Sequence, residues 1–177
     1  MAASERYGTV AILFHWSIAV LIVLAFALGL TVDLFPESWK GAVINTHSLI
    51  GLAVLLLSIF RLSWRRIHPI PEFSEAVGPF VRISAKVAHA TLYVLMILVP
   101  LIGIPTLLFR GRGLDFGFLQ IASPFEKSKE IFGPLTEFHQ FAAYALIGLA
   151  VAHILAAVYH HRVLKDDTMR RMSPWVP

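Results

Sequence analysis

Residues 136–162, TEFHQFAAYALIGLAVAHILAAVYHHR, decide the fold of this chain. Between Glu137 and Arg162 lie 24 residues without a single Asp, Glu, Lys or Arg. A helix needs about 20 mainly apolar residues to cross the hydrocarbon core of a bilayer. The stretch therefore predicts a transmembrane helix, and this helix carries two histidines, His139 and His153.

Three more stretches of 20 to 26 residues lack charged side chains; they lie between Arg6 and Asp33, between Lys40 and Arg61, and between Lys86 and Arg110. In lipid every backbone amide must be paired internally, which a helix does within one segment. The sequence therefore predicts an all-α fold, an integral membrane four-helix bundle that forms a single domain over 1–177, with helices near 8–32, 41–62, 83–109 and 136–162. Pro100 and Pro105 are expected to kink the third helix or to end its regular part early.

The composition agrees with a membrane protein. Hydrophobic residues make up 57% of the 177 residues and charged residues only 15%, whereas a soluble domain has roughly 25% charged residues. The net charge of +4 is explained by the positive-inside rule, so no nucleic-acid partner is expected. The absence of cysteine excludes disulfides, iron–sulfur clusters and covalently attached haem.

The basic residues predict the orientation. Ten of the fifteen Lys and Arg residues would lie on the side of the two termini and five on the other side. Because Lys and Arg are enriched in cytoplasmic loops, both termini are expected in the cytoplasm.

Five of the eight histidines fall within the predicted spans, namely His15, His47, His89, His139 and His153. An ionisable residue inside a membrane span is costly, and by default it indicates a functional site. The remaining three are expected at the cytoplasmic side: His68 solvated in a connection, and His160 and His161 at the end of the last helix.

The depths of these histidines fall into two pairs. His139 and His153 are 14 residues apart, about four helical turns, so they point the same way and lie about 21 Å apart along the axis. His15 has the depth of His153, in the cytoplasmic half, and His47 has the depth of His139, in the periplasmic half. Two haems, each held by two imidazoles, would fit this arrangement.

Small residues follow each paired histidine by four positions, on the same helix face: Ala19, Gly51, Ala143 and Ala157. A flat macrocycle needs such neighbours. The alternatives are structural histidines that form interhelical hydrogen bonds, or one metal site, which the 14-residue separation excludes. Tyr93 follows His89 at this position, so we expect His89 to act as a hydrogen-bond donor to a haem edge or substrate, or in packing.

The chain resembles the bacterial cytochrome b561 family over nearly its whole length. The resemblance is carried by an ordered set of short motifs: His15-Trp16, Ile44-Asn45-Thr46-His47, His89-Ala90-Thr91-Leu92-Tyr93, Glu137-Phe138-His139, His153, His160-His161 and Lys165-Asp166-Asp167-Thr168. It implies a dihaem protein of the bacterial inner membrane. His15 and His153 would bind the cytoplasmic-side haem b, and His47 and His139 the periplasmic-side haem b.

The resemblance is strongest to family members that oxidise superoxide to O2 at the periplasmic side and reduce ubiquinone. It implies an oxidoreductase whose ubiquinone site includes His160. Leu13 stands where a relative of this type has a polar residue, so the remaining quinone contacts are not assigned. Two alternatives stay open: a membrane electron-transfer subunit between quinol and another periplasmic redox partner, and a non-redox membrane protein whose histidines bind a metal or relay protons.

Overall fold

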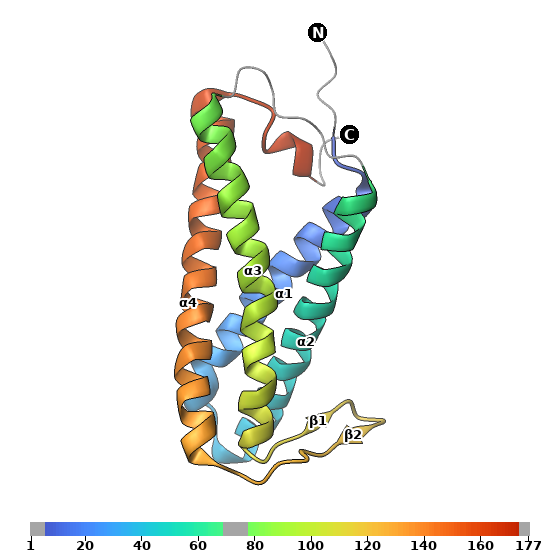
Figure 1. Ribbon diagram of the computed structural model, residues 1–177, viewed down its shortest axis with the longest axis vertical. Helices are drawn as coiled ribbons and strands as arrows, with labels where there is room; N and C mark the ends of the chain where they lie inside the picture. Colours follow the sequence, from blue (N-terminus) through green and yellow to red (C-terminus); the bar gives the residue numbers. More distant parts are fainter. Residues whose placement is uncertain (1–5, 69–77, 174–177) are drawn as a thin grey trace.

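A computed structural model describes residues 6–68 and 78–173 of the chain as a bundle of four long helices (Figure 1). The helices are α1 Thr9–Thr31, α2 Glu37–Ile67, α3 Pro79–Phe109 and α4 Lys129–Tyr159. Each is long and apolar enough to cross a membrane. The predicted all-α membrane bundle is thereby confirmed, and the chain is a multi-pass membrane protein; that it forms one domain over 1–177 stays a prediction.

Three of the helices, α2, α3 and α4, begin before the charge-free stretches that predicted them. α2 begins four residues earlier, after Pro36, and its last turn contains Arg65 and Arg66. A charged residue ends the hydrocarbon part of a span but not the helix, because long basic side chains reach the headgroup region. α3 also continues through Pro100 and Pro105 to Phe109, the end predicted for it. Of the two effects expected of these prolines, an early end of the regular helix is therefore not observed; neighbouring helices make such prolines tolerable in lipid.

Both termini lie at one end of the bundle, called here the termini end (Figure 1). The opposite end, the hairpin end, carries the short strands β1 Leu114–Asp115 and β2 Gln120–Ile121, which pair antiparallel. Asn45 of α2 fixes this hairpin, since its side chain bonds both the carbonyl (2.8 Å) and the amide (2.9 Å) of Asp115.

Helices that follow one another in the chain pack together, α1 on α2, α2 on α3 and α3 on α4. Phe26 of α1 and Tyr144 of α4, with ring centres 5.8 Å apart, connect these two helices through their side chains. The core lies halfway along it, where Ile18, Met96 and Leu146 form a buried cluster.

Each helix places three residues, spaced by seven, in the same three layers of the bundle. The termini-end layer contains His15, Arg61, His89 and His153; the middle layer contains Ile22, Val54, Met96 and Leu146; the hairpin-end layer contains Gly29, His47, Gly103 and His139. Seven residues advance a helix by about 10 Å. The apolar middle layer therefore separates two polar layers, which both contain histidines.

Candidate cofactor sites

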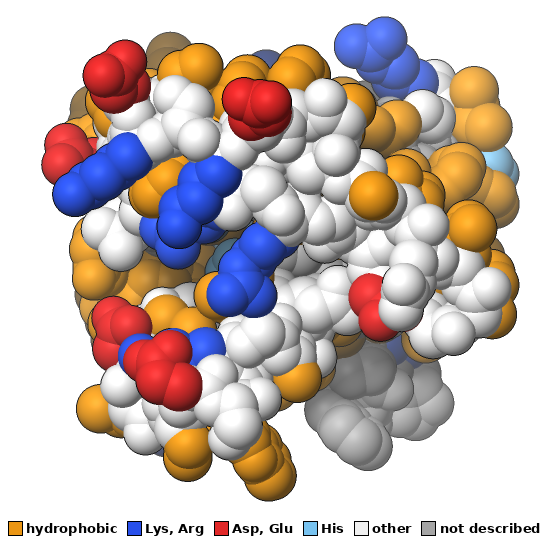
Figure 2. All heavy atoms as spheres, turned by 90° about the horizontal axis from the view of Figure 1, so that it is seen from below, with side chains coloured by type: hydrophobic (Ala, Val, Ile, Leu, Met, Phe, Trp, Pro, Cys, Tyr) orange, Lys and Arg blue, Asp and Glu red, His pale blue; other side chains and the backbone are white. Residues whose placement is uncertain are grey.

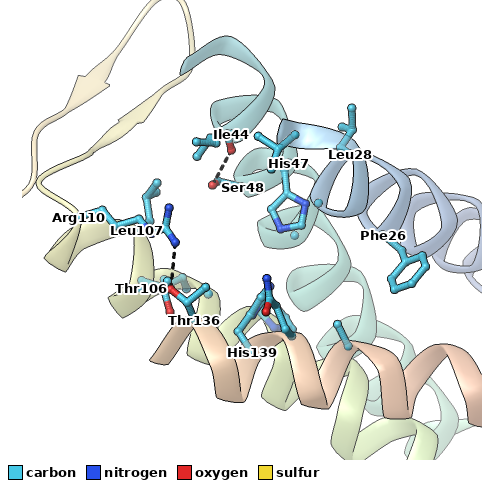
Figure 3. Close-up of a pocket in the computed structure, with 18 of the residues that line it drawn as sticks. Phe26, Leu28, Ile44, His47, Ser48, Thr106, Leu107, Arg110, Thr136 and His139 are labelled. Atoms are coloured by element: carbon cyan, nitrogen blue, oxygen red, sulfur yellow. Dashed lines mark hydrogen bonds between the residues drawn. The ribbon is translucent and has the colours of Figure 1, made fainter. Parts of the chain in front are cut away.

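His47 of α2 and His139 of α4 meet in the hairpin-end layer. Their ring centres are 5.9 Å apart and the ring planes are inclined by 77°. Both rings point into one cavity from opposite sides (Figure 3). The depths of His47 and His139 in their predicted spans indicated this pairing, and the structure brings the two side chains together.

A backbone carbonyl of the neighbouring helix orients each of these rings. Nδ1 of His47 lies 2.8 Å from the carbonyl oxygen of Ala25, and Nδ1 of His139 lies 2.9 Å from that of Val99. A carbonyl only accepts, so Nδ1 carries the proton in both rings. Nε2 of each ring is then left with a free lone pair, the form in which imidazole binds a metal.

Two glycines make this contact possible. A Cβ atom on Gly29 would lie 3.1 Å from Cε1 of His47, and one on Gly103 would lie 3.0 Å from Cε1 of His139. Each glycine follows the accepting carbonyl by four residues, so it lies directly beside that carbonyl on the helix surface. Without a side chain there, the imidazole can reach the backbone.

The cavity between the two rings contains about 1290 Å³ of atom-free space, including its open mouth. Gly51 and Ala143, two of the small residues expected beside a macrocycle, line it. Arg110 also lines it, donating to the Thr136 hydroxyl at 3.0 Å (Figure 3).

His15 of α1 and His153 of α4 meet in the termini-end layer, with ring centres 6.3 Å apart and planes inclined by 71°. Metal–imidazole bonds are about 2 Å long, and each nitrogen lies about 1 Å from its ring centre. Two imidazoles on opposite sides of one metal ion therefore have centres about 6 Å apart. Both pairs have this separation.

The surroundings of the termini-end pair are polar side chains. The His89 ring lies 5.3 Å from that of His153, and Arg61 lies over the Tyr93 ring, 5.5 Å from its centre. Within the described chain, His15 Nδ1 and the Tyr93 hydroxyl are buried without a hydrogen-bond partner. No group of three or more His, Asp or Glu residues in that part of the chain could hold a metal ion.

His160 starts the π-helical turn His160–Leu164 that follows α4. Its Nδ1 lies 2.5 Å from Oδ2 of Asp166. Partial burial on its own raises the pKa of Asp166, but hydrogen bonds from His160 and Thr168 outweigh it and hold that pKa below its usual value. His161 is exposed, and exposed His68 stacks on Trp64 with ring centres 3.7 Å apart.

The segment after α4, residues 165–173 (the C-terminal strap), returns across the termini end to the start of α1 (Figure 1). Trp16 Nε1 donates to the carbonyl of Met172 at 2.9 Å, and Arg6 donates to that of Ser173 at 2.7 Å. The amide of Tyr7 bonds the carbonyl of Arg171. The strap thus covers the bundle end closest to His15, His89 and His153.

The sequence matches the family described as prokaryotic cytochrome b561 over residues 6–175. The chain belongs to this cytochrome b561 family. Membership assigns it to membrane electron transfer with b-type haem and leaves no support for the non-redox alternative. It also agrees with the imidazole pairs inside the bundle.

Curated relatives cover almost the whole cytochrome b561 chain. "Cytochrome b561 homolog 2" of Escherichia coli strain K12 is 29% identical over 95% of this chain and 91% of its own length. "Probable superoxide oxidase CybB" of Yersinia pestis is 30% identical over 96% of this chain and 97% of its own length. "Cytochrome b562" of Cereibacter sphaeroides is 29% identical over 97% and 98%.

Several residues of these sites were missed by sequence reasoning. Gly29 and Gly103 were not singled out, nor was the partner of His160, Asp166. A signal for the glycines was present, because 14 residues separate His15 from Gly29 and His89 from Gly103, as they separate His139 from His153. The Asp166 contact depends on the π-helical turn and on Lys165, whose φ is +53°, and neither has a clear sequence signal.

Proposed function

We propose that this cytochrome b561 holds two b haems and carries electrons across the bacterial inner membrane, from superoxide at the hairpin end to ubiquinone at the termini end. His47 and His139 hold one haem, and His15 and His153 hold the other. One observation carries the proposal: two imidazole pairs have the separation that one shared metal ion requires, on opposite sides of an apolar layer. The excess of basic residues at the termini end supports placing that end in the cytoplasm.

The residues at the hairpin end fit such a group. Both Nε2 atoms are free to bind iron, and Gly51 and Ala143 leave room beside the histidines. Nε of Arg110 is buried without a partner in the described chain, so the guanidinium can take up a carboxylate such as a haem propionate. When bound, a haem held by two histidines transfers one electron at a time and offers no open iron position to oxygen.

The proposed reaction balances with two superoxide anions for each quinone. Each superoxide loses one electron and becomes O2, while one ubiquinone gains two electrons and two protons and becomes ubiquinol. The first half needs a surface that an anion can approach, and the second half needs a proton source. The two ends of the bundle supply these two features.

The hairpin end has no basic excess, since five basic and six acidic residues, including Glu137, give it a summed charge of −1. The distribution of these charges is uneven, however. Figure 2 shows this end with basic side chains bordering a hollow in the face. A local basic rim of this kind raises the concentration of a small anion at a site even where the net charge does not.

At the termini end, His160 and Asp166 supply the chemistry that a quinone carbonyl needs. The carboxylate of Asp166 accepts from Nδ1 of His160, which fixes the ring and leaves Nε2 to face a substrate. The pair can hold a proton at His160 and replace it from water, because His160 and Asp166 are only half-buried. This is our assignment of the ubiquinone site.

A second candidate function is supported by the negative summed charge of the hairpin end. There the chain would be the membrane subunit that passes electrons between quinol and a periplasmic redox protein. The exposed tip of the hairpin, where Phe118 is 89% exposed, would be available for protein contact.

Purified protein in liposomes with ubiquinone separates the two functions. Enzymatically generated superoxide should reduce ubiquinone without any added protein, and superoxide dismutase should abolish this reduction. His153→Ala, which breaks the termini-end pair, serves as the matched inactive control. Ubiquinone reduction that appears only after a periplasmic protein is added would overturn the superoxide assignment in favour of the second function.

A further inference from the structure

The two histidine pairs differ in what surrounds them. In the hairpin-end layer the positions that face His47 and His139 are glycines, Gly29 and Gly103. In the termini-end layer the corresponding positions of α2 and α3 are Arg61 and His89. One pair is therefore bordered by neutral backbone, and the other by a guanidinium and a third imidazole.

At the hairpin end both rings donate to carbonyl oxygens, at 2.8 and 2.9 Å. Such a bond places more electron density on the metal-binding nitrogen and makes the imidazole more basic. A more basic ligand stabilises the oxidised iron. The contacts of His47 and His139 thus lower the midpoint potential of a haem held between them.

At the termini end the same support is missing from His15, whose Nδ1 has no hydrogen-bond partner among the described residues. The half-buried guanidinium of Arg61 lies in this layer, over the ring of Tyr93, which follows His89 on α3 by one helical turn. Within the described chain no carboxylate forms an ion pair with this guanidinium. A fixed positive charge in a low-dielectric interior favours the state with one more electron.

Arg110 does not cancel this contrast. It lies seven residues beyond Gly103 on α3, about 10 Å farther toward the membrane surface. Its guanidinium lies 5.0 Å from the Phe132 ring centre and donates to Thr136. A haem propionate taken up by Arg110, as proposed above, would neutralise its charge.

We propose that Arg61, together with the carbonyl contacts of the opposite pair, gives the termini-end haem the higher midpoint potential, so that electrons run from the hairpin end to the termini end. Arg61 is thus a tuning residue that sets the direction of transfer. The inference rests on the proposed ligand pairs, and it names a residue for a property that the ligands alone do not fix.

Single-haem variants test the order of potentials directly. His47→Ala should retain only the termini-end haem, and His153→Ala only the hairpin-end haem. In anaerobic optical redox titrations of the two purified proteins, the haem retained by His47→Ala should titrate at the higher potential. The opposite order would overturn the inference. If instead both variants lose the same haem, the ligand assignment fails, which is a different result.

The role of Arg61 is tested in the intact two-haem protein. Arg61→Gln should lower the midpoint potential of the upper titration wave by at least about 59 mV. For one electron this corresponds to about a tenfold change in the oxidised-to-reduced ratio at fixed potential. The lower wave should stay in place. Arg61→Lys keeps the charge and should stay close to wild type. Arg66→Gln, the matched control, removes an exposed charge from the same helix end and should move neither wave.

A shift of the lower wave, or of neither wave, with both haems retained would refute the role of Arg61. Should Arg61→Gln lose the termini-end haem while Arg61→Lys retains it, the charge is needed at this site for binding. Equal potentials in the two single-haem variants would then still refute the proposed direction.

Discussion

Gly103→Ala changes one methyl group at the point where the His139 ring meets α3. The added Cβ would lie 3.0 Å from Cε1 and 3.3 Å from Nδ1 of His139, where carbon contacts normally lie at about 3.5–4.0 Å. The ring must therefore retreat by about 0.5 Å. Its hydrogen bond to Val99, now 2.9 Å, would lengthen beyond the usual limit of about 3.2 Å.

The effects on stability and on haem binding should differ. Losing the hydrogen bond costs about 0.5–1.5 kcal/mol, while replacing glycine by alanine in a helix gains about 0.8–1.0 kcal/mol. Global stability should hardly change. Removing the hydrogen-bond partner of a metal-binding histidine, in contrast, typically lowers the affinity for the metal by about 10–100-fold. The affinity of the hairpin-end site for haem should fall by a similar factor.

The assay is haem retention in a His153→Ala background, where only the hairpin-end site remains. Haem per chain is measured during dilution or competition with a haem-binding protein, and unfolding is followed in parallel by circular dichroism. Gly148→Ala is the matched control, because a Cβ there meets nothing within 4 Å. Gly103→Ala protein that retains haem as tightly as the Gly148→Ala protein would refute the reasoning.

Four further predictions concern the strap and the core. Asp166→Asn should slow ubiquinone reduction and flatten its pH profile, whereas Asp167→Asn, whose carboxylate pairs with Arg170 at 3.6 Å, should change neither. Hydrogen bonds hold the pKa of Asp166 below the usual 3.8. The contribution of Asp166 to strap docking is therefore fully present above pH 3.8 and is lost only as the pH falls below that value. Hydrogen exchange showing that the strap is released near neutral pH would contradict this. Trp16→Phe removes the hydrogen bond to the Met172 carbonyl. This should lower the free energy needed to open the strap by about 1 kcal/mol, which is measured as faster hydrogen exchange of the Arg171 amide without loss of haem. Leu146→Ala, at a side chain only 5% exposed in the middle layer, should cost about 2–5 kcal/mol of stability while leaving both haem spectra unchanged; altered spectra would mean that the layer does not insulate the sites.

The sequence was sufficient for the fold and for the histidine pairing, and the reason is physical. Lipid excludes charge, so gaps between charged residues mark the spans, and 3.6 residues per turn convert the spacing of His139 and His153 into depth. The pairing of His47 with His139 follows from the alternating direction of successive helices. These features depend on the chain alone and not on details of packing.

The outer contacts of the histidines could not be predicted in the same way. Whether Nδ1 of His139 reaches a carbonyl depends on how closely α3 and α4 approach each other. Gly103 allows a close approach, but a glycine in the sequence does not by itself predict one. Likewise, the position of Arg61 over the Tyr93 ring depends on the rotation of α2 in the bundle. The helix ends were missed because a charge such as Arg65 leaves the hydrocarbon without ending the helix.

The most direct test of the central claim is haem stoichiometry with low-spin optical spectra for the wild type, His47→Ala and His153→Ala. We predict two haems per chain in the wild type and one in each variant, with the two remaining haems spectrally or electrochemically distinct. One haem per chain in the wild type, or loss of the same haem in both variants, would contradict the account.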